Sequence, residues 1–230
     1  MFTINPTPFD IRLVAFRIPI RVHPSFWLGS MIFGQSLGSP ELIFLWVICS
    51  FVSILIHELG HALTAEAYGW PTEIVLYFGG GLAMSQRSYN ETPWKSILVA
   101  LMGPVAGFLF LGVIFVVMIG TALTGQGQGP ETVTSFSLYF HEALSFLFFM
   151  NLYWGLLNLI PVMPLDGGQI ARSLCEMFRF RDPIRAALKL GIVASGAAAY
   201  YFLVQQKEMM PGMLMLMLCL QNVGALQSPR

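Results

Sequence analysis

The chain has 230 residues, of which 56% are hydrophobic and only 10% are charged. Soluble domains usually carry about 25% charged residues, so this composition excludes an ordinary soluble domain and predicts a protein that crosses a membrane several times. The twelve basic and twelve acidic residues balance, and no basic patch is dense enough to bind nucleic acid. We therefore expect a lipid bilayer, and no nucleic acid, among the partners.

Six apolar segments are candidates for membrane-spanning helices, each of which needs about 20 largely apolar residues. In chain order they cover residues 24–37, 42–68, 94–123, 136–160, 183–204 and 211–226. The first is short and interrupted, and both the first and the last suit tilted or half-inserted helices. The connection 69–93 is too short to hold a second globular domain. Residues 1–230 are therefore expected to form one domain around the core spans 42–68, 94–123 and 136–160.

Two further segments are predicted to be β-strands. Residues 11–22 alternate loosely and are rich in Val, Ile and Arg, and residues 72–84 form a β-prone run interrupted by three glycines. The expected fold class is an all-α polytopic membrane protein with about six transmembrane helices. A small membrane-associated β-sheet or hairpin is expected to pack against those helices at one membrane face.

The basic residues predict the orientation in the membrane. They cluster before the first predicted span, after the second and after the fourth, whereas the connections 38–41 and 124–135 contain no Lys or Arg. Lys and Arg are in excess on the cytoplasmic side, and six spans place all three clusters there if the N-terminus is cytoplasmic. We predict a multi-pass protein of the cell (plasma) membrane, with an active site that opens to the cytoplasm.

A five-residue motif, His57-Glu58-Leu59-Gly60-His61, follows an uncharged stretch inside the second predicted span. Residues four apart share a helix face, so His57 and His61 can offer two imidazoles to one metal ion. Zinc accepts such nitrogens, and Glu58 is placed to take a proton from an attacking water. Ionisable residues in a membrane span are costly and mark function. The motif predicts an intramembrane zinc hydrolase.

Catalytic zinc takes three protein ligands and keeps one open position. Pro161 and Pro164 end the fourth predicted span, and the loop after it can return Asp166 toward the protein interior. Glu66 is the competing ligand, but it lies five residues after His61, about 140° round the helix, and points away from the histidine face. The pattern therefore favours Asp166 as the third ligand.

These residues resemble a known family. The sequences H-E-L-G-H at 57–61 and N-L-I-P-V-M-P-L-D-G-G at 158–168 are similar to the two motifs of the site-2 proteases, which are intramembrane zinc metalloproteases. Residues 103–107, G-P-V-A-G, resemble a third family motif, in which many members have Asn at the position of Gly107. The similarity extends over residues 11–190 and indicates a compact member without a peptide-binding (PDZ) or nucleotide-sensing (CBS) domain.

The resemblance implies one Zn²⁺ per chain, held by His57, His61 and Asp166, with Glu58 as the general base and acid. It implies regulated intramembrane proteolysis, in which a transmembrane segment of another protein is cut within the membrane. Family members often act on an anti-sigma factor or on the precursor of a membrane-bound transcription factor, so such proteins are the implied partners.

A helical substrate must unwind before a peptide bond is accessible, and in lipid its unpaired backbone groups need partners. The run 72–84 is able to accept the substrate as an added strand, with Gly79, Gly80 and Gly81 permitting close approach. The family pattern favours Asn158 as a contact to the same strand. The alternative is that the glycines only form a turn.

Two other functions are compatible with a metal motif in a membrane protein. One is a zinc transporter, and the other is a catalytically inactive metal-binding membrane scaffold. A transporter needs a relay of ligands across the membrane, which these apolar spans do not supply. Neither alternative has a specific use for Glu58 beside the first histidine, so this residue discriminates between them and a protease.

Overall fold

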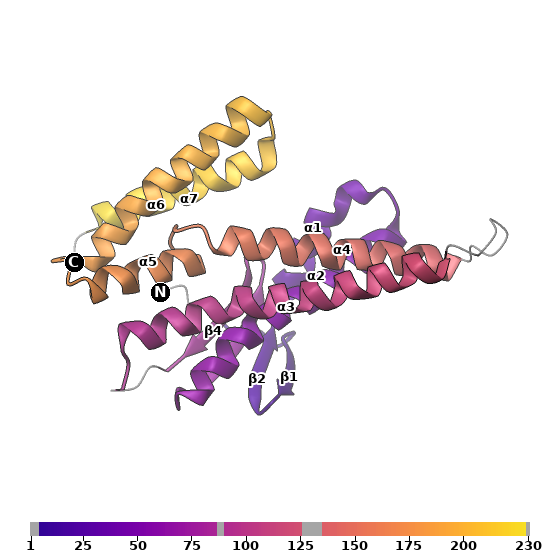
Figure 1. Cartoon of the computed structure of the whole chain (residues 1–230), viewed down its shortest axis with the longest axis horizontal. Coiled ribbons are helices and arrows are strands. Elements are labelled where there is room, and N and C mark those ends of the chain that lie inside the picture. Colours follow the sequence, from indigo (N-terminus) through magenta and orange to yellow (C-terminus); the bar gives the residue numbers. More distant parts are fainter. Residues whose placement is uncertain (1–4, 87–89, 126–134, 229–230) are drawn as a thin grey trace. The chain divides into compact units, whose positions relative to one another are not determined.

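The computed structural model describes residues 5–86, 90–125 and 135–228. They form two compact units, which comprise residues 1–88 with 102–155, and residues 89–101 with 156–230. The elements, most of which are labelled in Figure 1, are in chain order β1 (Ile11–Ala15), β2 (Ile18–Val22), α1 (Pro24–Gly34), η1 (Gln35–Leu37), α2 (Pro40–Ala67), β3 (Thr72–Tyr77), β4 (Gly80–Ser85), α3 (Pro93–Gly125), α4 (Ser135–Asn158), α5 (Asp166–Met177), α6 (Pro183–Tyr200), η3 (Tyr201–Gln206) and α7 (Met209–Gln227).

The first unit contains a four-stranded sheet in the order β1-β2-β3-β4. β1 and β2 are antiparallel, β2 and β3 are parallel, and β3 and β4 are antiparallel. Alternate residues of β2 and β3 point to one face, where they are buried with side chains of α1 and α2. This core contains Ile18, Ile20, Val22, Phe26, Ile54, Ala62, Ile74 and Leu76. The small sheet expected from the sequence is therefore present, and its core side packs on α2.

The sheet corrects one strand prediction. Residues 11–22 are not a single strand but a hairpin, with a two-residue turn at Phe16 and Arg17. Neither residue is a usual turn former, so no local pattern indicated a reversal there. In the second hairpin the glycines do mark the reversal, because β3 ends at Tyr77 and β4 begins at Gly80, which has φ of 116°.

α2 is the longest helix whose residues all belong to the first unit. Its start follows from the local sequence: the Ser39 hydroxyl accepts a hydrogen bond from the Leu42 amide at 3.3 Å, Pro40 occupies the first turn, and Glu41 complements the helix dipole. It ends just before Gly69, which has φ of 75°. The apolar composition between these signals makes one uninterrupted helix of 28 residues.

Four of the described helical segments are long and apolar enough to cross a membrane: Pro40–Ala67, Pro93–Leu123, Pro183–Gln206 and Met209–Gln227. The predicted count of six spans is not confirmed. α1 has only 11 residues, about 16 Å of helix, which is about half the thickness of the hydrocarbon core. α4 has sufficient length, but His141, Glu142, Asn151 and Asn158 make it more polar than the other four.

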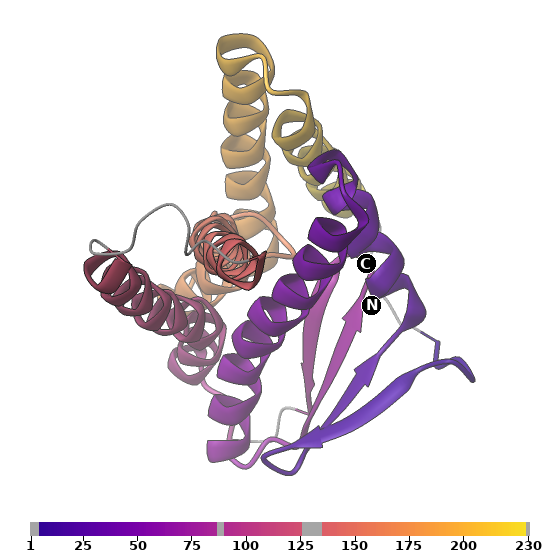
Figure 2. The same cartoon turned by 90° about the vertical axis from the view of Figure 1, so that its right-hand side faces the viewer.

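The second unit is built around α6 and α7, which pack side by side (Figures 1 and 2). α6 starts where the Asp182 carboxylate accepts a hydrogen bond from the Arg185 amide at 3.1 Å, with Pro183 in the first turn. The buried core of this second unit consists of Val162, Ala199, Met215 and Leu218. Because Val162 belongs to the connection between α4 and α5, this core also fixes the segment that leads into α5.

Candidate functional site

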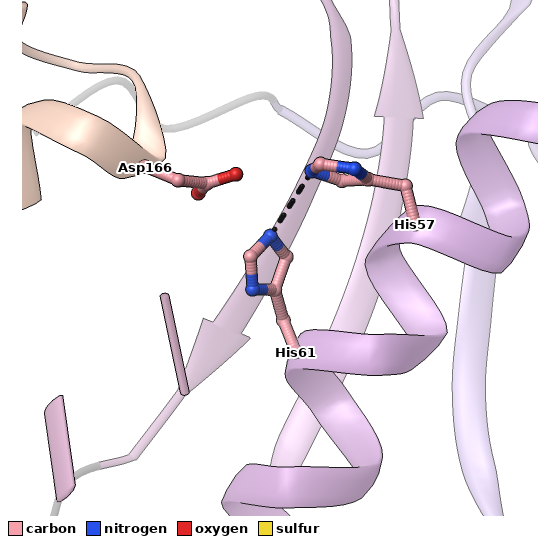
Figure 3. A group of neighbouring side chains, drawn as sticks. All are labelled: His57, His61 and Asp166. Carbon is pink, nitrogen blue, oxygen red and sulfur yellow. Dashed lines mark hydrogen bonds between the residues drawn. The ribbon is translucent and has the colours of Figure 1, made fainter. Parts of the chain in front are cut away.

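The second half of α2 carries two histidines that are one helical turn apart. His57 and His61 are only 3% and 7% exposed. Their rings are nearly perpendicular, with centroids 4.8 Å apart, and their Nε2 atoms lie 3.2 Å from each other. Figure 3 shows the two rings turned toward one another, together with Asp166, the third ligand expected from the sequence. The helical spacing has thus produced the pair of imidazoles that the motif predicted.

The nitrogen positions fit a tetrahedral metal ion. Two nitrogens that are each about 2.05 Å from such an ion lie about 3.3 Å apart, which is close to the 3.2 Å separation of the two Nε2 atoms. Two buried imidazoles whose acceptor atoms face each other need a cation or a shared proton between them. The donor set and its spacing therefore suit zinc.

Glu58 lies on α2 beside this pair and under the sheet. Its side chain is buried at 5% exposure, and a Cβ atom added at Gly81 of β4 would collide with it. Burial and the charge of Glu58 raise the pKa of the Tyr77 hydroxyl on β3 above its ordinary value. The carboxylate is therefore held between its helix and the β3–β4 hairpin, next to the two imidazoles.

The other two glycines predicted to bind substrate lie at the turn of this hairpin. A Cβ at Gly80 would meet the Trp154 ring at 2.8 Å, and one at Gly79 would meet the Tyr77 ring at 2.9 Å. β4 is at one edge of the sheet. The glycines thus serve a turn and also allow the edge strand to approach α2, whereas their predicted contact with a substrate strand stays a prediction.

The contact between α2 and α3 also depends on glycine. A Cβ at Gly60 would collide with the Met102 backbone, and one at Gly103 would collide with the His61 imidazole. The sequence indicated Gly103 as part of a family-like motif and as a small residue that permits a close contact between helices. Its spacing of four residues from Gly107 was the available signal for a close helix contact.

Position 107, where many members of the resembled family have Asn, faces an amide from another helix. A Cβ at Gly107 would lie 3.6 Å from the Asn151 Oδ1 atom. Asn151 is buried, and its Nδ2 group donates to the Ser53 hydroxyl at 2.9 Å and to the Leu147 carbonyl at 2.7 Å. Sequence reasoning missed Asn151, although an amide within an apolar helix is itself a signal.

Asp166 and Asn158 belong to the second unit. Asp166 is 7% exposed and is the first residue of α5, where the positive end of the helix dipole favours a carboxylate. Asn158 is buried at the last residue of α4. Glu66, the competing ligand, is exposed, and its Oε1 atom accepts a hydrogen bond from the Thr72 amide at 2.8 Å.

Close backbone contacts shape the segment before Asp166. A Cβ at Gly167 would collide with the Leu159 and Ile160 carbonyl oxygens, and one at Gly168 would lie about 2.5 Å from the Val162 carbonyl carbon. The two glycines therefore allow α5 to start tightly against the segment that follows α4. The return of the chain predicted from Pro161 and Pro164 is present.

A residue from α7 also contacts this segment. The Asn222 Nδ2 group donates to the Met163 carbonyl at 2.7 Å, and the residue is 1% exposed. No local pattern in the sequence identifies Asn222, because its partner is 59 residues away in the chain.

The model of peptidase family M50 matches residues 45–140 and 131–203 of this chain. A Synechocystis protein with the provisional name of zinc metalloprotease is 34% identical over 174 residues, which are 69% of this chain and 42% of that protein. A zinc metalloprotease of Methanocaldococcus jannaschii is 29% identical over 188 residues, 80% of this chain and 51% of that protein. The chain therefore spans about half the length of these curated relatives.

Among solved structures, the site-2 protease from Methanocaldococcus jannaschii has a TM-score of 0.60 to this chain at 23% sequence identity. The superposition covers 96% of this chain and 97% of that one. At this level of identity the two proteins share a fold.

Proposed function

This chain belongs to peptidase family M50, and from that premise we propose that it is a zinc metalloprotease that hydrolyses a peptide bond within transmembrane segments of other proteins. The observation that carries the proposal is a buried pair, His57 and His61, with Glu58 beside it, on a helix that is long and apolar enough to cross a membrane. A reactive site in such a helix meets substrates that are themselves in the bilayer. The reaction would make the protein an agent of regulated intramembrane proteolysis.

One zinc per chain would be held by His57, His61 and Asp166. The 3.2 Å spacing of the two Nε2 atoms and the burial of all three side chains support this ligand set, as do the names of the relatives, which are zinc metalloproteases. Bound zinc acts as a Lewis acid that lowers the pKa of water to about 7 and polarises the scissile carbonyl.

Glu58 would be the general base and then the general acid. Its carboxylate takes a proton from the attacking water, and it returns that proton to the leaving amine when the carbon–nitrogen bond breaks. The backbone at Gly81 leaves just enough space for this side chain and limits its movement. A fixed carboxylate beside the metal ligands is what proton transfer at a defined atom requires.

Replacing Glu58 by Gln tests the reaction. The variant keeps the size of the side chain and loses the base, so we expect full zinc content and cleavage slower by about 10²–10⁴-fold. Co-expression with candidate single-span substrates, followed by immunoblotting of the products, measures this. A transporter or an inactive scaffold would cleave nothing in either form, and near wild-type cleavage by the variant would exclude the proposed role of Glu58.

Replacing a ligand tests the metal site. Purified His61→Ala and Asp166→Ala variants should lose most of their zinc in metal analysis, because a three-ligand site does not retain the ion well with two. Glu66→Gln is the matched control, since it removes the competing carboxylate, and it should keep full zinc content. Full zinc content in both ligand variants would contradict the assignment.

The substrate would bind as an added strand at the free edge of β4, the strand that passes over Glu58. Gly79, Gly80 and Gly81 would permit its close approach, and Asn158 would contact its backbone. Substrates with Gly or Pro near the scissile bond should be cut faster than uniformly Leu-rich spans, because they unwind more easily. Equal cleavage of matched Leu-only and Gly-containing spans, at equal expression and insertion, would exclude unwinding as the limiting step.

We further propose one protease domain with about six spans, in which α4 and the short, half-inserted segment of α1 with η1 add to the four apolar segments. The N-terminus and the opening of the site would face the cytoplasm, and the protein would lie in the cell membrane. An anti-sigma factor or a transcription factor precursor would be the substrate.

The orientation can be tested by labelling. Single cysteines introduced at Ser85 and at the exposed Arg181 should react with an impermeant thiol reagent only in inside-out vesicles. Labelling of both in right-side-out vesicles would reverse the orientation.

A further inference from the structure

The turn between β1 and β2 is made by two residues in the left-handed backbone region. The φ angle is 52° at Phe16 and 67° at Arg17, as expected for the two-residue turn that suits twisted antiparallel strands. Such turns are usually Asn-Gly or Asp-Gly, because a Cβ atom strains this conformation. The chain therefore keeps a phenylalanine and an arginine where Asn-Gly would fold with less strain.

Neither side chain relieves this strain by packing. Phe16 is 74% exposed and Arg17 is also exposed. Arg17 forms no ion pair within residues 5–86, 90–125 and 135–228. Strained backbone at exposed side chains is a sign of function rather than of folding, so the reason for these two residues lies outside the described fold.

The surface around the turn is apolar and positively charged. Val14 is 73% exposed beside Phe16, and Arg12 is exposed on the same strand as Val14. Two carboxylates near the hairpin, those of Asp10 and Glu73, are paired with Arg21 at 3.1 Å and 3.4 Å. Exposed aromatic and aliphatic groups edged by arginines suit the boundary between anionic lipid headgroups and acyl chains.

The position of the turn within the first unit agrees with such a surface. α2 has 28 residues and is about 42 Å long, whereas the hydrocarbon core is about 30 Å thick, so both ends of this span lie near a membrane–water interface. Figure 2 shows the β1–β2 turn at the same end of the unit as the C-terminal end of α2. The turn is therefore at the depth of the headgroups.

The same residue pattern recurs where chain continuity fixes the depth. Residues 178–181 read Phe-Arg-Phe-Arg, and Arg179 also has a left-handed φ of 56°. Phe178 and Phe180 are 70% and 54% exposed, and the candidate span Pro183–Gln206 begins two residues after Arg181. This chain thus already places alternating Phe and Arg beside a membrane span.

We propose that the β1–β2 turn is an anchor in the membrane interface. Phe16 and Val14 enter the boundary between headgroups and acyl chains, and Arg12 and Arg17 bind phosphate groups of anionic lipids. Because β1 is hydrogen-bonded through β2 and β3 to β4, this anchor sets the depth of the whole sheet, including the strand over Glu58. The anchoring does not depend on the metal chemistry.

The test uses the full-length protein in nanodiscs of phosphatidylcholine alone or with about 30% phosphatidylglycerol. The three free cysteines are replaced by alanine, and an environment-sensitive dye is placed on Val14→Cys. A dye on Phe180→Cys, beside a candidate span, is the interface reference. Lipids with a spin label near the headgroup should quench both dyes, and the extent of quenching at the two positions should agree within about twofold. Phosphatidylglycerol should increase the quenching at position 14.

A double variant separates anchoring from folding. Phe16→Asn with Arg17→Gly supplies the favoured turn, so its melting temperature should equal or exceed that of the parent, while lipid quenching at position 14 falls by at least about fivefold. Phe16→Trp with Arg17→Lys keeps an aromatic ring and a cation and should retain the quenching.

Three results would overturn the proposal. The first is a dye at position 14 that soluble iodide reaches freely in anionic discs. The second is an Asn-Gly variant that keeps full lipid quenching or fails to fold. The third is a dye shielded from both iodide and spin-labelled lipid, which would show that β1 pairs with a protein instead of a membrane.

Discussion

The proposed zinc ligands are held by two different kinds of interaction, one in each compact unit. His57 and His61 are four residues apart in an unbroken helix, so the hydrogen bonds of α2 itself place both imidazoles on one face. Asp166 follows a segment that is neither helix nor strand. Its position depends on what that segment contacts.

The contacts of the Asp166 segment come from distant parts of the chain. Gly167 and Gly168 allow the backbone of α5 to lie against the segment after α4, and Asn222 of α7 donates to the Met163 carbonyl. The histidine pair thus tolerates changes that leave α2 helical, whereas the aspartate responds to changes far away in sequence. Four experiments test this contrast, in order of expected effect.

Gly167→Ala should have the largest effect, because the added Cβ collides with two backbone carbonyls that cannot rotate away. We expect zinc affinity to fall by about 100-fold and cleavage to fall with it. Isothermal titration with zinc measures the affinity. Gly196→Ala is the matched control in the same unit, since its Cβ would make an ordinary 3.7 Å contact to the Cys219 sulfur. An unchanged affinity in Gly167→Ala would show that the Asp166 segment adjusts freely.

Gly103→Ala tests how the α2–α3 contact orients the His61 ring. The new methyl group collides with the His61 ring, which can partly rotate, so we expect zinc affinity lower by about 10–100-fold with α2 helicity unchanged by circular dichroism. Gly112→Ala, where no atom lies within 4 Å of the added Cβ, should bind zinc normally. If both variants bind alike, the α2–α3 contact does not control the orientation of His61.

Asn222→Leu keeps the size of the side chain and removes the hydrogen bond to the Met163 carbonyl. Zinc affinity should fall by about tenfold, while the absorption spectrum of the cobalt-substituted protein should move toward that of Asp166→Ala. Gln221→Leu, at the exposed neighbouring residue, is the control and should change neither. A cobalt spectrum identical to wild type would mean that Asn222 supports only the fold.

Metal removal should produce the smallest effect and should act on one region only. After treatment with a chelator, amide hydrogen exchange should accelerate at residues 162–165 by a few-fold, because the segment loses the anchor at Asp166. Exchange at residues 57–61 should stay the same, since their amides are protected by the helix. Equal acceleration in both regions would show that the metal stabilises the α2 helix as much as the Asp166 segment.

Sequence reasoning located the helices well where local signals mark their ends. The core spans predicted at 42–68, 94–123 and 136–160 correspond to α2, α3 and α4, with ends that differ by one or two residues. The histidine geometry followed for the same reason. The assignment of His57, Glu58, His61 and Asp166 to zinc binding and catalysis remains a prediction that the variants above test.

Other features had a weak local signal or none. The reversal at Phe16 and Arg17 was missed because these residues are poor turn formers. The predicted count of six spans is not confirmed, since four of the described helical segments are long and apolar enough to cross a membrane. Gly103, Asn151 and Asn222 act on partners in other helices. Hydropathy and turn chemistry describe neighbours in sequence, so neither reports such contacts.

The sequence by itself determined that this is a membrane protein with two imidazoles and a carboxylate close together on an apolar helix, because composition and helical periodicity are local properties. The tertiary structure decided that glycine at 81 and 103 is required beside Glu58 and His61, and that α7 supports the segment before Asp166. Those facts depend on the distance between backbones that are far apart in the chain. Such distances are set only when the helices and the sheet pack.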